Sequence, residues 1–338
     1  MEPVREAEEI SNIAFGYIAS KALFAALHIN VFTLLAKGPL TAADIAAKTS
    51  VPENRVTTLV TVLLSLGLLI KVSEGFENSP GAASFLSRGA KYDFSDYLRY
   101  QVDRQMFPFM ADLEAVMSGN TAPDAIDSYS KWMADPAEAK LYSDSQHSGS
   151  LGPARSLVRM LDLSGPQTML DVAGGTGAFA ITFCEANPDL TATVVDFPNV
   201  ASLGEKYVAD AGLSDRVIFA AEDALQGDWP QDRDFVLMSY LFSGVPGDAI
   251  PDLARRAFAA LKPGGCYIVH DFIVDDDRTG PPLAALWQLQ HMTFTPDAKS
   301  VTPGWLSGVL TGVGFGDVET NDLIPGMTRV MMARKPDG

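Results

Sequence analysis

The sequence predicts an α/β protein whose C-terminal half is a mainly parallel, doubly wound sheet of the Rossmann-like type. Short apolar strands alternate with helical segments from Gln167 onward, which is typical of consecutive β-α-β units. A glycine-rich turn at residues 173–178 follows the strand at 168–172 and opens a helix. Asp196 ends the next apolar run, about twenty residues later. Strand, glycine turn, helix and acid together form the layout of a nucleotide-type ligand site.

The N-terminal residues 1–90 are expected to form a separate, mostly α-helical unit. Apolar side chains recur at helical spacing over residues 10–36. Residues 41–44 have the pattern of a capping box, and Pro52 is suited to open the next helix. Residues 68–77 then have the pattern of a small hairpin. Helix, helix and hairpin in this order indicate a winged-helix-like domain.

Residues 91–164 are predicted to be a helical linker that also contributes to the substrate pocket. Gly165 and Pro166 mark the entry into the ligand-binding domain, residues 165–338. A last edge strand is expected at residues 330–333. Before it, the predicted strands and helices alternate through 168–172, 179–186, 192–196, 201–211, 216–220, 234–241, 248–260, 265–273 and 303–313.

The balance of charged residues argues against two kinds of partner. With 25 basic and 42 acidic side chains, the chain has a formal net charge of −17, so nucleic acids and anionic membranes repel it. A winged-helix pattern also occurs in DNA-binding regulators, but residues 37–77 carry four basic and four acidic side chains. Because this unit has no positive face, a ligand-sensing transcriptional regulator is the third of the functions considered.

Neither secretion nor a metal site is indicated. The N-terminus is acidic and lacks the order of a secretion signal, and the most apolar stretch, Leu59 to Ile70, is too short to span a bilayer. Cys184 and Cys266 lack C-x-x-C spacing and a neighbouring histidine cluster, so neither a disulfide framework nor a metal is expected. We therefore expect a soluble, cytoplasmic protein.

The details of the glycine turn favour S-adenosylmethionine (SAM) over a dinucleotide. The spacing Gly174-Gly175-x-Gly177 lacks the G-x-G-x-x-G series that seats a pyrophosphate on a helix N-terminus. Asp171 lies just before the turn, where a carboxylate repels a diphosphate and suits the ammonium group of an amino acid moiety.

This stretch resembles the glycine-rich motif of the class I SAM-dependent methyltransferases. Three later segments fit the same order of motifs: residues 195–200 (Val-Asp-Phe-Pro-Asn-Val), 221–224 (Ala-Glu-Asp-Ala) and 261–265 (Leu-Lys-Pro-Gly-Gly). With the N-terminal pattern, they resemble the small-molecule O-methyltransferases of plants and bacteria over nearly the whole chain. The resemblance implies a homodimer interlocked through the winged-helix domain, and a small-molecule substrate.

The expected cofactor site lies beyond the carboxyl ends of the strands, where such sheets bind their ligands. The resemblance assigns Asp196 to the ribose and Asp223 to the adenine amine, and it assigns the turn after the first strand to the methionine part. The predicted cofactor-binding residues are Asp171, Gly174, Gly175, Gly177, Asp196, Phe197, Asp223, Ala224 and Ser239.

The general base of the resembling enzymes is absent from its usual place. An oxygen nucleophile loses its proton as the methyl group arrives, and in those enzymes a histidine followed by Asp-Trp accepts that proton. Here the corresponding segment, residues 239–244, reads Ser-Tyr-Leu-Phe-Ser-Gly, and we place Phe242 at the position of the histidine. A second acid of the family is missing from residues 298–302, and Asp271 is the candidate for the remaining one.

Three explanations for the missing base are open. The acceptor is a thioether sulfur, which has no proton to lose; or it is a carbon of an activated ring; or His291 or His147 supplies the base. We favour the first, since the chain is similar to the marine bacterial S-methyltransferases that act on 4-methylthio-2-hydroxybutyrate in dimethylsulfoniopropionate synthesis. The alternative is O-methylation or C-methylation of a phenolic, pigment-like or antibiotic-like molecule.

The predicted substrate pocket combines aromatic and polar side chains. Ring faces attract a developing sulfonium by cation–π interaction, and polar groups suit a small hydroxy acid. His291 follows Trp287 by one helical turn, so both are expected on one face. His291 and Tyr142 are the candidates for positioning the reacting groups. The predicted substrate-binding residues are Tyr142, Gln146, His147, Tyr240, Phe242, Trp287 and His291.

Overall fold

The computed structural model describes residues 3–120, 129–165 and 167–337. The chain divides into two compact units, Met1–Gln105 and Met106–Gly338. The division lies inside the segment 91–164 that was expected to link the domains.

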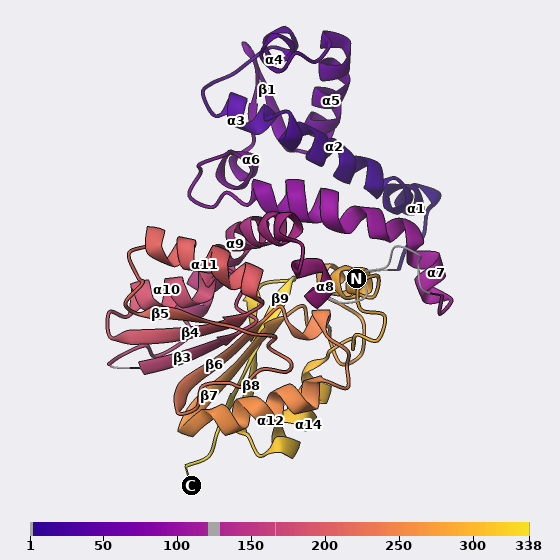
Figure 1. Cartoon of the computed structure of the whole chain (residues 1–338). Helices are drawn as coiled ribbons and strands as arrows, with labels where there is room; N and C mark the ends of the chain where they lie inside the picture. Colours follow the sequence, from indigo (N-terminus) through magenta and orange to yellow (C-terminus); the bar gives the residue numbers. More distant parts are fainter. Residues whose placement is uncertain (1–2, 121–128, 166, 338) are drawn as a thin grey trace. The chain divides into compact units, whose positions relative to one another are not determined.

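The first unit contains a helical bundle with a short hairpin, in the expected order helix, helix, hairpin. The capping box is present, because Thr41 Oγ1 accepts a hydrogen bond from Asp44 N (3.1 Å) and Asp44 Oδ2 accepts one from Thr41 N (2.9 Å). The elements are α1 (Ala7–Ala14), α2 (Gly16–His28), α3 (Val31–Leu35), α4 (Ala42–Thr49), α5 (Glu53–Ser65), β1 (Leu69–Val72), β2 (Gly75–Asn78), α6 (Pro80–Phe85) and the π-helix η1 (Tyr97–Met106) (Figure 1). Phe32, Ile45 and Leu63 lie at the centre of its core.

The helical stretch Ala7–His28 leaves much of its apolar surface exposed. Among the described residues, this is the one helical segment that is both long enough and apolar enough to cross a membrane, judged by length and composition alone. The stretch from Leu59 to Ile70, which is the most apolar in the sequence, lies in α5 and β1 and is a different segment. The large apolar side chains that Ala7–His28 exposes are Ile10, Ile13, Phe15, Tyr17 and Ile18.

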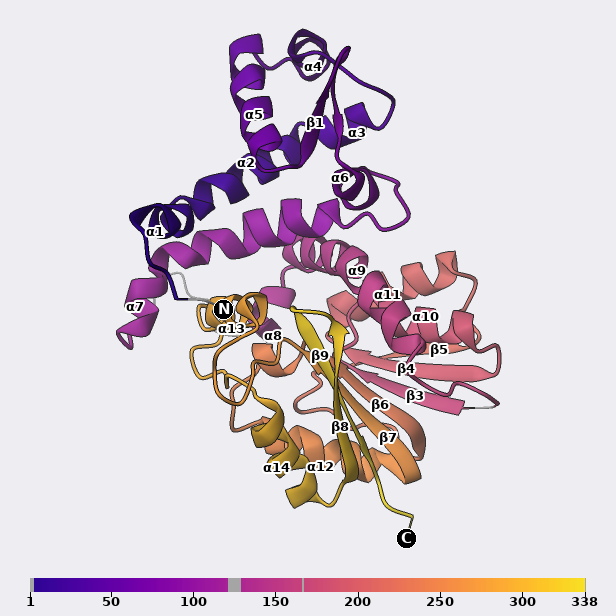
Figure 2. The ribbon, with the colours of Figure 1, turned by 180° about the vertical axis from the view of Figure 1, so that it is seen from behind.

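The second unit is built on a seven-stranded sheet with the order β5-β4-β3-β6-β7-β9-β8 (Figure 2). The first five strands in this order pair in parallel, and the pairs β7–β9 and β9–β8 are antiparallel. The strands are β3 (Gln167–Val172), β4 (Leu190–Asp196), β5 (Val217–Ala221), β6 (Arg233–Ser239), β7 (Leu261–Asp271), β8 (Gly316–Ile324) and β9 (Thr328–Arg334).

The strand expected at the sheet edge lies inside the sheet. Residues 330–333 belong to β9, which pairs with β7 on one side and with β8 on the other. The edge prediction was wrong because β8 reads Gly-Asp-Val-Glu-Thr-Asn-Asp-Leu-Ile, which has no apolar alternation to identify it. An edge strand that is mostly exposed does not need alternating apolar residues.

Helices cover both faces of the sheet. Alternate side chains of β3 point to opposite faces, so Leu170 and Val172 join one core while Met169 joins the other. Helices α12 and α14 pack on the first face, and α9, α10 and α11 pack on the second (Figure 1). The helices of this unit are η2 (Phe107–Asp112), α7 (Leu113–Met117), α8 (Tyr129–Met133), α9 (Pro136–Val158), α10 (Ala178–Ala186), α11 (Pro198–Asp210), η3 (Phe242–Gly244), α12 (Ile250–Ala260), α13 (Pro282–His291) and α14 (Pro303–Val313).

A substitution in α11 tests the packing of this helix on the sheet. A Cβ atom on Gly204 would lie 2.3 Å from Cζ of Phe219, so Gly204→Ala is expected to lower the free energy of unfolding by about 1–3 kcal/mol. Gly308→Ala in α14 is the matched control, because its Cβ would meet nothing within 4 Å and alanine favours the helix by about 0.5–1 kcal/mol. Denaturant unfolding of the two variants should therefore give shifts of opposite sign, and equal shifts would contradict this packing.

Candidate cofactor and acceptor site

A cavity of about 690 Å³ lies in the second unit, at the carboxyl ends of the parallel strands. It opens where the strand order reverses, between β3 and β6, which is the position at which doubly wound sheets bind ligands. Each of these strands is followed by a non-glycine residue in the left-handed region, Ala173 (φ 54°) after β3 and Tyr240 (φ 58°) after β6. Such strained backbone is concentrated at functional sites, and both residues line the cavity.

The glycine-rich turn brings the backbone to the cavity wall. Gly174 permits a close approach, since a Cβ atom there would lie 2.5 Å from Cγ of Asp171 and 2.8 Å from Cγ1 of Val194. Gly177 has a φ of 78° and is the N-cap of α10. Gly174 and Gly175 line the cavity. Gly177 does not line it, and its left-handed backbone conformation allows the turn to form.

Asp171 is a fully buried carboxyl group at the wall of the cavity. Neither side-chain oxygen accepts a hydrogen bond within standard geometry from the described residues, although the residue lines the cavity. Burial, reinforced by the neighbouring charge of Asp196, raises the pKa of Asp171 to about 7. A buried acceptor of this kind is costly unless it is paired, so the site fits a cationic donor such as an ammonium group.

Asp196 is held in place by the two neighbouring segments. Its Oδ2 accepts a hydrogen bond from Gly175 N (2.7 Å) and its Oδ1 accepts one from Phe197 N (2.8 Å). Burial raises the pKa of Asp196 to about 6, although the two hydrogen bonds from Gly175 and Phe197 act to lower it. Each carboxylate oxygen keeps a second lone pair, so the fixed side chain can still accept hydrogen bonds from a ligand.

Asp223 and its neighbours form the far wall of the same cavity. Asp223 Oδ1 accepts a hydrogen bond from Leu225 N (2.9 Å), which orders the turn after β5. Ala224, Phe197 and Ser239 also line the cavity. Ser239 Oγ lies 2.8 Å from Nδ1 of the buried His270, and this hydrogen bond orients the Ser239 hydroxyl group. Apart from Gly177, all predicted cofactor residues therefore line one cavity.

An aromatic cluster forms the acceptor side of the cavity. Tyr129, Tyr142 and Phe294 line it, and Trp132 lies behind them. The rings of Trp132 and Phe294 stack with centroids 5.8 Å apart, and those of Trp132 and Tyr142 meet edge to face at 5.2 Å. Phe109 packs on Phe294 at 4.8 Å. The result is an ordered wall of ring faces and edges.

Gln146 and His147 of α9 supply polar atoms at the same cavity. His147 Nδ1 lies 2.7 Å from Thr176 Oγ1 in the glycine-rich turn, and its ring stacks on Tyr207 at 4.0 Å. Burial lowers the pKa of His147 to about 4. The imidazole is therefore neutral at physiological pH and is tied to the turn.

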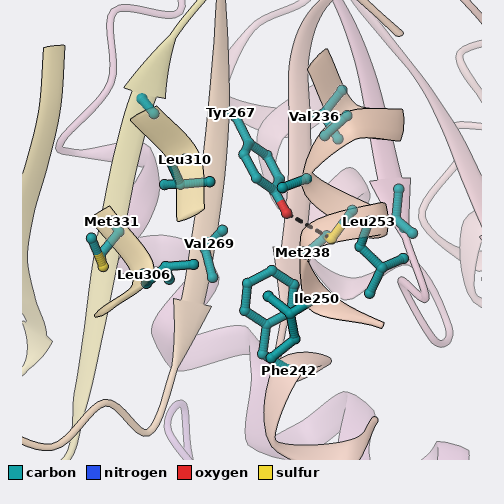
Figure 3. Packing of buried hydrophobic residues seen from close by; sticks show 14 of the residues in the cluster. Val236, Met238, Phe242, Ile250, Leu253, Tyr267, Val269, Leu306, Leu310 and Met331 are labelled. Carbon is teal, nitrogen blue, oxygen red and sulfur yellow. Dashed lines mark hydrogen bonds between the residues drawn. The ribbon is translucent and has the colours of Figure 1, made fainter. Parts of the chain in front are cut away.

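Phe242 does not line the cavity, contrary to expectation. It is fully buried in the core between the sheet and α12, where it packs with Ile250 (Figure 3). The reason is that η3 turns this side chain inward, while Tyr240 and Leu241 face the cavity.

Trp287 and His291 are also outside the residues that line the cavity. They do share one face of α13, with ring centroids 5.4 Å apart, as their spacing predicted. That face packs on the segment after β7, however: Trp287 stacks on Phe272 at 4.4 Å. His291 is 5% exposed, and burial lowers its pKa to about 4.

Asp271 stabilises the turn in which a base was sought. Its Oδ2 accepts a hydrogen bond from Ser243 N (3.0 Å) and its Oδ1 accepts one from Phe272 N (2.8 Å). The acid thus fixes the backbone of η3 instead of orienting an imidazole.

Sequence reasoning missed several lining residues, among them Tyr129, Lys131, Thr176 and Asp297. The first two lie in α8, a five-residue helix that has no periodic pattern of its own. The pair Tyr129 and Trp132 at helical spacing was the available signal.

Family models cover most of the chain. Residues 119–316 match the model of an O-methyltransferase domain, and residues 11–88 match that of an O-methyltransferase dimerisation domain. The chain belongs to this O-methyltransferase family. The expected fold class is thereby confirmed, as are the enzyme class, SAM-dependent methyltransferase, and the cofactor SAM. The dimerisation domain implies a homodimer.

Members of this family are similar to the chain over nearly their full length. The tetracenomycin polyketide synthesis 8-O-methyl transferase of Streptomyces glaucescens is 28% identical over 98% of both chains. The 3-hydroxy-5-methyl-1-naphthoate 3-O-methyltransferase of Streptomyces sahachiroi is 29% identical, over 92% of this chain and 90% of its own. The fold is also that of human N-acetylserotonin methyltransferase in complex with SAM, with a TM-score of 0.87, 24% identity and coverage of 99% and 100%.

The raised pKa of Asp171 predicts a pH-dependent affinity for SAM. Below about pH 7 the carboxyl group of the free protein is increasingly protonated and loses the charge that suits an ammonium. The dissociation constant should therefore fall as the pH rises from about 5.5 to about 7.5, by up to tenfold per pH unit below the pKa. Asp171→Asn should bind more weakly and keep only the smaller dependence due to Asp196, whose pKa is about 6. Calorimetric titration with SAM measures both, and a wild-type affinity that is constant over this range would contradict the role of Asp171.

Proposed function

We propose that this chain methylates the ionised hydroxyl group of a flat, polycyclic aromatic small molecule. The observation that carries this proposal is the aromatic wall of the cavity, formed by Tyr129, Tyr142 and Phe294 with Trp132 behind. Offset or edge-to-face contact with an acceptor ring contributes about 0.5–1.5 kcal/mol for each pair beyond simple burial. The names of the two Streptomyces relatives, which refer to a polyketide and a naphthoate, support the same class of acceptor.

The cofactor end of the cavity is assigned to the glycine-rich turn. We assign Asp171 to the ammonium group, Asp196 to the ribose hydroxyls and Asp223 to the adenine amine, with Phe197, Ala224 and Ser239 around them. Gly174 and Gly175 give the backbone access, and Gly177 sets the turn. SAM, when bound, supplies an electrophilic methyl group on a sulfonium. Asp171 and Asp196 supply negative charge at the same end, which favours a cationic ligand.

The acceptor is proposed to arrive already ionised, because His147, the histidine among the described residues that line the cavity, is a poor base, and Asp171 is assigned to the ammonium group of the cofactor. His147 has a pKa lowered to about 4, far below that of a typical phenol near 10. Its Nδ1 is also engaged with Thr176. Asp271, the remaining acid of the expected base machinery, accepts backbone N–H bonds instead. Hydroxyls made acidic by a fused quinone or carbonyl group meet this requirement without a base.

The same lack of a base favours a second candidate, the S-methylation of a small thioether acid such as 4-methylthio-2-hydroxybutyrate. A thioether sulfur attacks through its lone pair and needs no proton acceptor. Gln146 and His147 are the polar groups available for its hydroxy acid part. We rank it second because the cavity wall and the named relatives fit a larger aromatic molecule.

The first unit is proposed to mediate the homodimer. Its exposed apolar stretch Ala7–His28 overlaps the matched dimerisation domain and suits burial against a partner copy. We place the enzyme in the cytoplasm, with a small-molecule substrate and without nucleic acid or membrane as partners.

Rates measured with acceptors of different acidity test the proposed reaction. Naphthols whose hydroxyl pKa values span about three units should each give a kcat/KM profile with a midpoint at the pKa of that acceptor, because kcat/KM reports the free reactants. A midpoint shared by all acceptors would instead identify a base on the enzyme. Turnover of the thioether acid with a flat profile, and no naphthol turnover, would replace the first candidate by the second.

Variants of Phe294 test the aromatic wall. Phe294→Ala removes the ring that lies between Trp132 and Phe109, so the KM for an aromatic acceptor should rise about tenfold. Phe294→Leu keeps most of the volume and should give an intermediate KM. The dissociation constant for SAM serves as the internal control and should stay unchanged in both variants. Equal KM values in all three proteins would show that the acceptor does not lie against this ring.

A further inference from the structure

A second cavity, of about 340 Å³, lies in the second unit behind α13. Its walls come from α13, from the segment after β7, from Ser243 of η3 and from residues 298–300. Val274, Leu289 and Met292 give it an apolar floor, and Val274 is 4% exposed. A volume near the lower end of the range for ligand pockets, about 300–1,000 Å³, suits one small molecule.

Two cations lie at the mouth of this cavity. Arg278 and Lys299 both line it and both are exposed to solvent. The described lining residues include no carboxylate, although the chain has 42 acidic side chains against 25 basic ones. The lining therefore combines an apolar interior with two cations and no carboxylate, although Asp276, whose pKa is lowered in part by the charge of Arg278, lies close by.

Both cations are held in position by their surroundings. Arg278 Nη1 donates to the carbonyl oxygen of Ser300 (3.1 Å) and to its Oγ (2.5 Å). Ser300 Oγ in turn donates to Gln288, whose amide is bonded to the carbonyl oxygens of Phe272 and Val301. The ammonium group of Lys299 lies 5.2 Å from the ring centroid of Trp305.

Backbone strain accompanies this network. Arg278 has a φ of 64°, a left-handed conformation that is rare for a non-glycine residue. Nη1 of Arg278 donates both of its hydrogen bonds to Ser300. The fork of a guanidinium has further N–H groups, which match the geometry of a carboxylate.

We propose that this cavity is a second binding site for a small apolar carboxylate. The apolar body would lie on Val274, Leu289 and Met292, and the carboxylate would lie between Arg278 and Lys299. The inference does not rest on the proposed acceptor, because no residue lines both cavities.

The two cavities are nevertheless neighbours along the chain. Gly244 lines the first and Ser243 the second, and the same holds for Asp297 and Ala298. Gly247 N donates a hydrogen bond to the carbonyl oxygen of Asp297 (2.9 Å). This bond joins the segment that contains Ser243 and Gly244 to the segment that contains Asp297 and Ala298. A molecule in the second cavity therefore contacts the segments that bound the first.

Binding of 4-bromobenzoate, measured by calorimetry on the full-length protein with saturating S-adenosylhomocysteine, tests the site. Lys299→Gln and Arg278→Gln should each weaken binding roughly three- to tenfold, since each removes one charge-assisted contact. The uncharged isostere 4-bromobenzamide should show a similar loss with the wild-type protein. Arg255→Gln is the matched control, because Arg255 is an exposed arginine on α12 paired with Asp252, and it should leave binding unchanged.

The bromine atom also locates the ligand. Anomalous diffraction from a crystal with 4-bromobenzoate should place bromine beside Leu289 and Met292. Phe294→Ala, in the first cavity, should leave the affinity unaltered. Bromine found in the first cavity alone, equal affinities for acid and amide, or binding that is insensitive to both Lys299→Gln and Arg278→Gln would each overturn the proposal.

Discussion

The buried carboxylate of Asp171 is the constraint on which the site depends. Taking an ionised group out of water costs several kcal/mol unless it is paired, and here no described residue pairs with it. Gly174 is required because any Cβ atom would meet this carboxylate. The neighbouring charge of Asp196 raises the cost further. These features are consistent with a site whose partner is a bound cation, so that ligand binding, and not folding alone, satisfies the charge.

The two-faced core keeps this charged group where it is. Strand β3 is central in the sheet, and its alternate residues are fully buried in two separate cores. Asp171 takes one of these inward positions at the end of the strand, next to Leu170 and Val172. Because side chains pack on both faces of β3, the carboxyl group of Asp171 is kept out of bulk water. Its ionised form is therefore stabilised when a cationic ligand binds next to it.

Residues whose roles depend on strand ends were predictable, whereas those that depend on how a helix is turned were not. Asp171, Asp196 and Ser239 line the cavity because a parallel sheet brings the ends of its strands together. Trp287 and His291 share a helical face as their spacing indicated, but nothing local tells which way that face points. Its direction is set by the stacking of Trp287 on Phe272, which lies fifteen residues earlier, just after β7. Strand β8 was missed for a related reason, since its exposed edge has no apolar pattern.

The charges of the cavity constrain the order in which ligands bind. Asp171, Asp196 and Asp223 all lie at the cofactor end, while the imidazoles of His147 and His270 are kept neutral by burial. An anionic acceptor entering the free protein therefore meets negative charge that no described cation in the glycine-rich turn offsets. After a cofactor with an ammonium and a sulfonium is bound, the same end of the cavity becomes attractive to a phenolate. For the proposed phenolate acceptor, the electrostatics of the site thus favour binding after the cofactor, because the sulfonium charge attracts the phenolate toward the methyl carbon that it attacks.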